Sequence, residues 1–232
     1  MLPTLKLALA VLVSLLPLNA LRVLGYRVLF GYTITESRLG FGTVILVDKL
    51  EIERAQIGLF NLFVGPMRVV IGKGASIGNR NTFSCGYWVL RDQYKESNYT
   101  RKLELGENVL ITSSHYFDIA GAFELGKNVL ITSSHHFDIA GTFKLGDRSW
   151  IAGIGSQFWT HGAGVRERDV VIGENCYLGS AVRFAPGSCI GDHVLVAMGS
   201  VVATPLLVDN ALVGGVPARV LKENYDWKSN DE

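Results

Sequence analysis

From residue 34 onward, an aliphatic or aromatic residue recurs about every six positions along the chain. Glycine commonly follows this residue, as in IGKGAS, LGENVL, LGDRSW and IGENCY, and a small residue often lies four places on. This period is typical of a parallel β-helix, in which each hexapeptide forms one strand and one corner. We therefore expect an all-β solenoid with three strands per coil around an apolar core. The predicted inward series is Ile57, Phe63, Ile71, Ile77, Phe83, Leu105, Ile111, Phe117, Leu125, Ile131, Phe137, Leu145, Ile151, Ile172, Leu178, Phe184, Ile190, Val196 and Val202.

The chain repeats one phrase of 20 residues almost without change. Residues 103–122 and 123–142 are identical at 16 of 20 positions. Three hexapeptides and two further residues make one coil, so the repetition predicts one additional coil. Such a coil adds about 4.8 Å to the stack, which is the spacing of paired strands. A natural tandem duplication and an engineered insertion would give the same sequence.

Two stretches, residues 89–102 and 161–169, interrupt the six-residue period. We expect both to leave the solenoid at the same corner, between the second and third strand of a coil, and loops on one edge commonly build a binding surface. His161 opens the second loop, and histidine is the usual general base near neutral pH. Counting back 20 and 40 residues places Gly141 and Gly121 beside it, with open space for the imidazole. A corner histidine bonded to a backbone carbonyl is the alternative interpretation.

The repeated phrase contributes further histidines and an aspartate. His115 and His135 occupy equivalent positions and are expected to stack, as hydrogen-bonded corner residues or, less simply, as zinc ligands. A closed zinc site needs four ligands, and no carboxylate or thiolate lies near in sequence, so no metal is expected. His136 and Asp138, one coil before His161, are predicted contacts of an acceptor substrate together with Trp159.

Residues 1–33 differ from the rest of the chain, because they are almost entirely apolar with few cations. Pro17, Asn19 and Arg22 interrupt the run before it reaches the ~20 residues that a spanning helix needs. We interpret residues 1–33 as an apolar helical segment, either a pair of helices on a membrane surface, a true span, or a cap on the open end of the solenoid. Residues 34–222 are then the β-helix domain, and residues 223–232 a polar tail.

Composition narrows the choice of partners. The formal net charge is +1 with charged residues at 19%, and no basic run appears, so nucleic acid is not an expected partner. The three cysteines are widely spaced and form neither a CxxC pair nor a disulfide framework. A reducing compartment is the natural interpretation, and we expect the protein in the cytoplasm at the inner face of the plasma membrane.

The C-terminal half resembles the hexapeptide-repeat O-acetyltransferases, of the colanic-acid and polysaccharide sugar acetyltransferase type. The residues that carry the resemblance are SQFWTHG, then VVIGENCYLGSAVRFAPGSCIGDHVLVAMGSVV, then LVGGVPARVLKE. The resemblance implies a left-handed β-helix, an exception to the right-handed crossover rule, and a homotrimer with active sites between subunits. It places the family's catalytic base on His161 and implies acetyl-CoA as the acyl donor. Its matching positions assign donor binding to Tyr177, Ser180, Met198, Ala203, Arg219 and Lys222.

Galactoside-type members of that family differ from this chain. They carry a His-rich loop and a Thr-Lys pair where this sequence has Ala203 and Thr204, so their sugar contacts do not transfer. The leading hypothesis is an acetyl-CoA-dependent O-acetyltransferase that modifies a sugar hydroxyl of a glycan, polysaccharide or lipid-linked precursor. The alternatives are an N-acyltransferase acting on an amino-sugar nucleotide, a non-enzymatic β-helix scaffold, and a zinc enzyme on the same fold.

Overall fold

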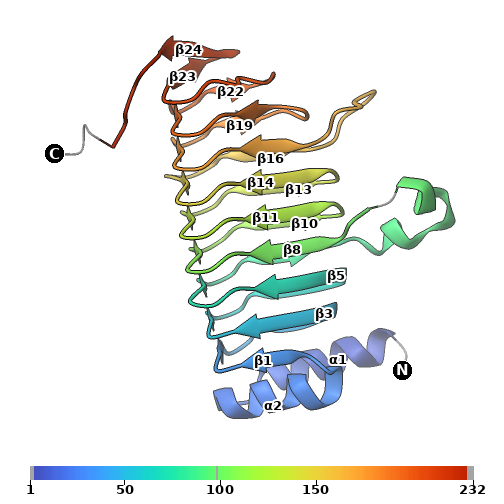
Figure 1. Cartoon of the computed structure of the whole chain (residues 1–232). Coiled ribbons are helices and arrows are strands. Elements are labelled where there is room, and N and C mark those ends of the chain that lie inside the picture. The colour runs from blue at the N-terminus through green and yellow to red at the C-terminus, as the bar shows by residue number, and fades with distance from the viewer. Residues whose placement is uncertain (1–2, 98, 229–232) are drawn as a thin grey trace.

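The computed structural model describes residues 3–97 and 99–228 and shows a parallel β-solenoid. Figure 1 shows the chain climbing from a helical base through a stack of similar coils to the C-terminal strands. The strands of the near face run from right to left as the chain rises, so the solenoid is left-handed (Figure 1). The predicted fold class is therefore confirmed.

Each coil contributes one strand to each of three faces, which we number in the order the chain meets them. Face 1 consists of β2 (Arg38–Leu39), β4 (Gln56–Ile57), β6 (Ser76–Ile77), β9 (Leu110–Ile111), β12 (Leu130–Ile131), β15 (Trp150–Ile151), β18 (Tyr177–Leu178), β21 (Leu195–Val196) and β23 (Leu212–Gly215), with β24 (Ala218–Lys222) antiparallel at its end. Face 2 contains β7 (Thr82–Ser84), β10 (Tyr116–Ile119), β13 (His136–Ile139), β16 (Gln157–Trp159), β19 (Arg183–Phe184) and β22 (Val201–Val202). Face 3 contains β1 (Thr33–Thr35), β8 (Lys102–Leu105), β11 (Ala122–Leu125), β14 (Thr142–Leu145), β17 (Val170–Ile172) and β20 (Cys189–Ile190). Two long strands, β3 (Val44–Glu53) and β5 (Leu62–Ile71), run through faces 2 and 3 without a break.

The predicted inward series forms the core. Every residue of that series is buried, with at most 4% of its surface exposed. Phenylalanines of successive coils stack along the axis inside face 2, and the rings of Phe83, Phe117 and Phe137 lie 4.4–4.6 Å apart. The two copies of the repeated phrase pair in register, with Phe117 opposite Phe137 and Leu110 opposite Leu130. The repetition therefore adds one coil, as predicted.

A ladder of side-chain acceptors runs up the corner between faces 1 and 2. At this corner, Asn61 Oδ1 accepts the backbone N–H of Asn81, and Asn81 Oδ1 accepts that of His115. His115 Nδ1 then accepts the N–H of His135, and His135 Nδ1 accepts that of Ser156. These bonds satisfy buried amides that the turning backbone leaves without a strand partner. The two stacked histidines, 5.4 Å between ring centroids, are thus members of a corner ladder.

Two antiparallel helices, α1 (Pro3–Ser14) and α2 (Asn19–Phe30), close the N-terminal end of the solenoid (Figure 1). Tyr26 is fully buried, and its hydroxyl donates to carbonyl oxygens of α1 and of Thr43 and accepts the N–H of Ile45. Arg22 is buried as well and donates to the carbonyl oxygen of Leu39. The helices therefore cap the core, which was one of the three interpretations of residues 1–33.

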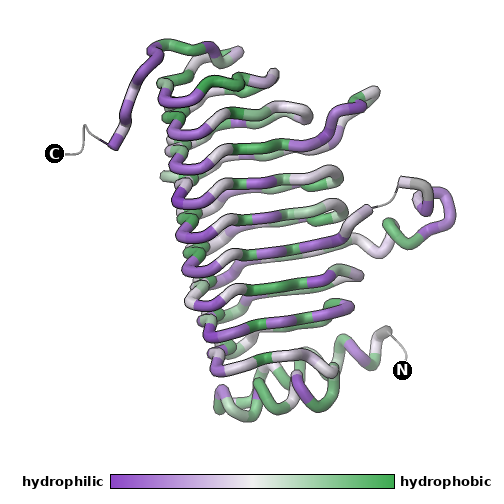
Figure 2. Tube along the Cα trace, in the orientation of Figure 1, coloured by the Kyte–Doolittle hydropathy of each residue, from purple (hydrophilic) through white to green (hydrophobic). Residues whose placement is uncertain are grey.

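The opposite side of the same helices is apolar and exposed. Figure 2 shows hydrophobic residues over most of both helices. The exposed apolar side chains of the two helices and the turn between them are Leu5, Leu7, Val11, Leu12, Leu15, Leu18, Leu21, Leu24, Val28 and Leu29. No helix within residues 3–97 and 99–228 is long and apolar enough to cross a membrane.

The C-terminal segment returns to face 1 after β24. The ring of Trp227 is buried against Trp150 and Tyr177, and its indole N–H donates to the carbonyl oxygen of Asn175. The tail predicted as polar thus includes an aromatic anchor among its described residues. The division into segments 1–33, 34–222 and 223–232 stays a prediction.

Candidate active site

Both interruptions of the repeat leave the solenoid at the corner between faces 2 and 3, as expected. The first loop lies between β7 and β8 and contains two short 3₁₀ helices, η1 (Tyr87–Leu90) and η2 (Asp92–Ser97). The second loop lies between β16 and β17. Two intact coils, the two copies of the repeated phrase, separate the loops along the axis. The loops therefore flank one segment of the corner.

His161 is held at this corner by the residue before it. The buried hydroxyl of Thr160 accepts the backbone N–H groups of Ala140 and Gly141, at 2.6 and 2.9 Å. The second loop closes where Asp169 Oδ1 accepts the N–H of Thr142. These bonds tie both ends of the loop to the coil below, so the backbone at His161 is held in place.

His161 forms a hydrogen bond with Asp138 of the neighbouring coil. Its Nε2 lies 2.8 Å from Asp138 Oδ2, and the two side chains are 46% and 26% exposed. An ionised carboxylate only accepts hydrogen bonds, so in this geometry Nε2 carries a proton and the neutral ring presents its lone pair on Nδ1. This is the arrangement of a general base with an orienting carboxylate.

The predicted neighbours of His161 are wrong by one residue. Phe137 pairs with Phe158, and Asp138 pairs with Trp159, so the step between these coils is 21 residues and not 20. Continuing this register places Ala140 beneath His161, where Gly141 was expected, and Ala120 one coil below, where Gly121 was expected. The space beside Gly141 is filled by Arg168 and Asp169. The open space that the imidazole needs lies instead over the two alanines.

That space is a cavity of about 320 Å³ between the two loops. Its floor is formed by the coils of the repeated phrase, and its residues are Trp88, Tyr94, Tyr99, Asp118, Ala120, Asp138, Ile139, Ala140, His161 and Arg168. Cavities of a few hundred Å³ with converging polar groups are typical of small-molecule sites. The structure therefore joins a candidate base to a cavity in which a substrate can lie.

The wall formed by the first loop is aromatic. The ring of Trp88 packs edge-on against Tyr94 and Tyr99, with centroids 5.1 and 5.3 Å away. Trp88 and Tyr99 also pack on the hydrophobic core, so the wall is anchored to the solenoid. The loop thus presents a supported apolar surface to the cavity.

Asp118 lies on the floor of the cavity, directly below Asp138 on face 2. Its Oδ1 is buried and has no hydrogen-bond partner within the described parts of the chain. Burial and the nearby charge of Asp138 raise the pKa of the Asp118 carboxyl. Burying a carboxylate oxygen without a partner is costly, so this atom is poised to receive a hydrogen bond from a bound molecule.

The predicted acceptor residues gather around His161. The ring of His136 lies 5.1 Å from that of Trp159, which in turn meets the ring of His161 edge-on at 6.2 Å. Tyr116 continues this outward stack one coil below, 5.1 Å from His136. Asp138 contacts His161 directly. Face 2 therefore carries a row of outward rings that ends beside the candidate base.

The predicted donor residues lie elsewhere in the chain and do not line this cavity. Ser180 and Met198 lie near the corner between faces 1 and 2, while Tyr177 lies on face 1 beneath Trp227. Ala203 follows β22 at the corner between faces 2 and 3. Arg219 and Lys222 lie on β24 and are exposed, with the ammonium of Lys222 over the ring of Tyr225. One chain therefore does not gather these six residues around His161.

The buried histidines of the ladder are not arranged as a metal centre. Within residues 3–97 and 99–228, no group of three or more His, Cys, Asp or Glu side chains could hold a metal ion. Burial lowers the pKa of His115 to about 3 and that of His135 to about 4. Both rings are therefore neutral near pH 7, as their acceptor role in the ladder requires.

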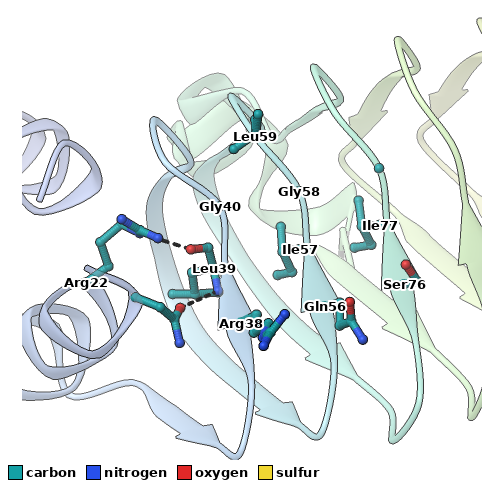
Figure 3. A pocket seen from close by; sticks show the side chains of 12 residues that line it. Arg22, Arg38, Leu39, Gly40, Gln56, Ile57, Gly58, Leu59, Ser76 and Ile77 are labelled. Carbon is teal, nitrogen blue, oxygen red and sulfur yellow. Dashed lines mark hydrogen bonds between the residues drawn. The ribbon is translucent and has the colours of Figure 1, made fainter. Parts of the chain in front are cut away.

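A second cavity, of about 570 Å³, lies between the helical cap and face 1 (Figure 3). Figure 3 shows Arg22 directed at Leu39, with Arg38, Gln56 and Ser76 along the wall. Neither a histidine nor a cysteine or carboxylate lines it. It therefore lacks a general base to activate the hydroxyl of Ser76, and the cavity beside His161 is the candidate active site.

Comparisons with known proteins agree with this fold and identify sequence relatives. Residues 169–204 match the family model described as bacterial transferase hexapeptide (six repeats). The protein named "Putative lipopolysaccharide biosynthesis O-acetyl transferase WbbJ" of Escherichia coli (strain K12) is 40% identical over 60 residues, which is 25% of this chain and 30% of that protein. The galactoside O-acetyltransferase of the same organism is 40% identical over 57 residues, which is 25% of this chain and 28% of that protein. The matches thus span less than a third of either relative's length.

A solved structure shows the same fold. LpxA, a UDP-N-acetylglucosamine acyltransferase from Bacteroides fragilis 9343, has a TM-score of 0.53 and 13% identity, covering 83% of this chain and 73% of that one. The chain is therefore a hexapeptide-repeat β-helix with sequence relatives among O-acetyltransferases, as the resemblance of its motifs indicated.

Sequence reasoning selected His161, which the structure places at the cavity, but missed much of the cavity lining. Asp118 was overlooked, although it is the counterpart of Asp138 in the repeated phrase. Trp88 and Arg168 were also missed, because loop residues outside the period carry no register from which to predict their direction. Tyr94 and Tyr99 lie within residues 89–102, which the sequence predicted only as a loop at the binding edge.

Proposed function

We propose that the protein is an acetyl-CoA-dependent O-acetyltransferase that acetylates a sugar hydroxyl of a glycan, polysaccharide or lipid-linked precursor. The observation that carries the proposal is the pair of His161 and Asp138 at the rim of a cavity large enough for a sugar ring. The family match over residues 169–204 and the two O-acetyltransferase relatives support the acyl-transfer chemistry.

In the proposed reaction His161 removes the proton from a sugar hydroxyl. The hydroxyl oxygen attacks the thioester carbonyl of acetyl-CoA, the carbon–sulfur bond breaks, and the thiol of CoA leaves with the proton that His161 held. Asp138 holds the imidazole in one tautomer and stabilises the imidazolium that forms during the step. A positioned general base contributes roughly 10²–10⁴-fold to such a rate.

The donor site is proposed on Tyr177, Ser180, Met198, Ala203, Arg219 and Lys222. Their separation from His161 within one chain favours a site completed by a second copy. The cations Arg219 and Lys222 are exposed and suit the phosphates of the nucleotide end of CoA. Met198, which is 75% exposed, is suited to line a groove that a partner subunit closes.

A homotrimer is proposed as the assembly. Outward positions of face 1 form an apolar row, with Leu110 and Trp150 exposed and Leu130 half-buried between them. A contiguous apolar row is rarely left exposed to solvent, and this one suits packing against a second copy of the chain. Light scattering is expected to give about three times the chain mass of 25.3 kDa.

Docking on a membrane surface is proposed for the helical cap. Its outer side exposes ten apolar side chains of α1, α2 and the turn between them, and the cations Lys6 and Arg27 are exposed as well. The first acidic residue of the chain is Glu36, so the cap is purely cationic. Apolar helices with basic residues suit the interface of an anionic bilayer.

The proposed function is tested by acetyl transfer with labelled acetyl-CoA and a panel of glycans. The wild-type protein is expected to form a labelled product from which hydroxylamine releases the acetyl group, as it does from an ester. The His161→Ala variant is expected to lose about two to four orders of magnitude in rate. Wild-type turnover by that variant would contradict the role of His161, and a hydroxylamine-resistant product would indicate N-acyl transfer.

A further inference from the structure

We propose that Asp118 and the aromatic wall of Trp88, Tyr94 and Tyr99 form an acceptor subsite that selects an uncharged sugar ring over an acidic one. That the bound sugar is then acetylated rests on the proposed function. The chemistry of the sugar that binds is argued from the cavity alone. The cavity lies directly beside His161, so a ring held here would present a hydroxyl to the base.

The aromatic wall supplies the apolar half of the recognition. Trp88 is held by edge-on contacts with Tyr94 and Tyr99 and packs on the core. Its ring is half-buried, and the cavity borders it. A sugar ring has an apolar C–H face that can pack on an aromatic face. A wall fixed in this way binds such a face with little loss of side-chain freedom.

Asp118 supplies the polar half. Its Oδ1 is buried at the floor of the cavity and lacks a partner within the described residues, whereas Asp138 is already paired with His161. A sugar hydroxyl that donates to Oδ1 would satisfy this atom. Hydrogen bonds to a buried carboxylate are strong, and a ligand without a donor at this point would leave the oxygen unpaired.

The charges of the cavity decide which sugar fits. Two carboxylates, Asp118 and Asp138, face one guanidinium, Arg168, and the imidazole of His161. With the imidazole neutral, the formal sum is −1, and the two aspartates occupy paired positions of adjacent strands. A sugar carboxylate bound beside them would be repelled at short range in a partly desolvated site. The cavity therefore favours a neutral hexose or N-acetylhexosamine.

The test measures sugar binding separately from acetyl transfer. Cellobiose and N,N′-diacetylchitobiose serve as neutral probes and digalacturonic acid as the acidic probe, with affinities taken from saturation-transfer NMR of the full-length protein. Asp118→Asn keeps the shape of the side chain and removes its charge. Glu124→Gln, on face 3 of the same repeated segment, is the matched control, and Tyr87→Ala is the control for Trp88→Ala.

The wild type is expected to bind a neutral probe at least about tenfold more tightly than the acidic one. Trp88→Ala should weaken all probes, while Asp118→Asn should weaken the neutral probes by about tenfold or more and strengthen the acidic one. Opposite changes for the two probe classes distinguish recognition by Asp118 from a loss of structure, which would weaken both. The control variants should bind like the wild type.

Equal or tighter binding of the acidic probe to the wild type would overturn the proposal, as would binding that neither variant alters or no binding of any probe. Failure of the proposed function has a different signature. In that case the wild type would bind the neutral probes through Trp88 and Asp118 but would transfer no acetyl group from acetyl-CoA to any glycan.

Discussion

Asp138 is expected to act on the reaction only through His161. Asp138→Asn offers an amide N–H₂ group to the imidazole and favours the opposite tautomer, so kcat should fall at least about tenfold. Because the side chain keeps its size, the free energy of unfolding should change little. Steady-state kinetics and urea unfolding of the same variant check both expectations.

A double-mutant cycle provides the control for that prediction. In a His161→Ala background, Asp138→Asn should cause almost no further loss, since the group it positions is already gone. Equal losses in both backgrounds would show that Asp138 acts independently of His161. A lowered midpoint of unfolding would instead assign it a role in folding.

The buried histidines of the corner ladder should make the protein less stable as the pH falls. Burial lowers the pKa of His115 to about 3 and of His135 to about 4, below the value of about 6.5 in the unfolded chain. The unfolded state therefore binds more protons below pH 6.5, and stability is lost from there down to the folded values. Each histidine costs up to about 1.4 kcal/mol per pH unit in this window. Urea unfolding at pH 7.5 and 5 measures the difference.

The double variant His115→Asn, His135→Asn is the matched control. Asn61 and Asn81 already fill the same ladder position and accept the N–H of the next coil. Asparagine should therefore preserve the ladder at pH 7.5 and remove the histidine contribution to the pH dependence. The carboxylates are common to both proteins and cancel in the comparison. An unchanged pH dependence in the variant would contradict the assignment.

At the residue scale, the sequence predicted His161 but not its surroundings. The repeated phrase has a step of 20 residues per coil. The prediction applied the same step to the following coil, which contains one additional residue. Ile154, which is 62% exposed, lies between Gly153 and Gly155, and both glycines adopt positive φ angles. One residue added at a corner leaves the inward period on either side intact, so the core pattern alone does not reveal it.

At the scale of single elements, the helical cap should determine whether the protein binds membranes. Leu24→Gln together with Val28→Gln replaces two apolar side chains on the exposed side of α2. Each substitution reduces the apolar surface area that would be transferred from water into the bilayer interface on binding. Co-sedimentation with vesicles of anionic lipid is expected for the wild type and should be strongly reduced for the double variant. Neutral vesicles should bind the wild type more weakly, because Lys6 and Arg27 lose their partners.

Exposed apolar residues outside the cap provide the control. Leu59→Gln and Leu207→Gln change exposed apolar side chains that lie on the solenoid. These variants should sediment with vesicles like the wild type. Wild-type protein that stays in the supernatant with anionic vesicles would contradict the docking proposal. Equal losses in the cap and solenoid variants would indicate a general effect of lowered hydrophobicity.

The strands and the places where the loops leave were predictable, whereas the shape of the first loop and the position of the helices were not. Each strand has an inward residue every six positions, and neighbouring coils impose the same spacing on one another. The first loop instead owes its shape to contacts among Trp88, Tyr94 and Tyr99, which follow no period. The cap was one of three interpretations, because an apolar helix suits a core and a membrane equally well. In the structure one side of the cap packs on the core and the other side is exposed.

For the whole molecule, the repeated coils set the distance between the two loops. The strands β7, β10, β13 and β16 are consecutive neighbours on face 2, and the loops leave after the first and the last of them. Three steps of about 4.8 Å separate the loops by about 14 Å along the axis. Both copies of the phrase contribute to the floor of the cavity, through Asp118 and Asp138. The duplication thus has a consequence for the site as well as for the length of the stack.

Removing either copy should leave a folded protein with an altered site. After deletion of residues 103–122 or of residues 123–142, the flanking coils can pair as the two copies do, because equivalent residues occupy the same register. One aspartate remains below Trp159 in each case, so His161 keeps its partner. The loops come about 4.8 Å closer, the second carboxylate is lost, and KM for the glycan should rise at least about tenfold.

The two deletions also control for one another. They yield chains that differ at only four positions. At one of these positions, beside Trp159, deletion of residues 123–142 retains Tyr116 and deletion of residues 103–122 retains His136. If His136 contacts the acceptor, the deletion that retains it should keep more of the transfer activity, while both should unfold at similar urea concentrations. A cooperative unfolding transition with an unchanged KM for the glycan would show that the spacing of the loops does not define the site. Loss of cooperative unfolding in both chains would show that the solenoid requires the additional coil for its stability.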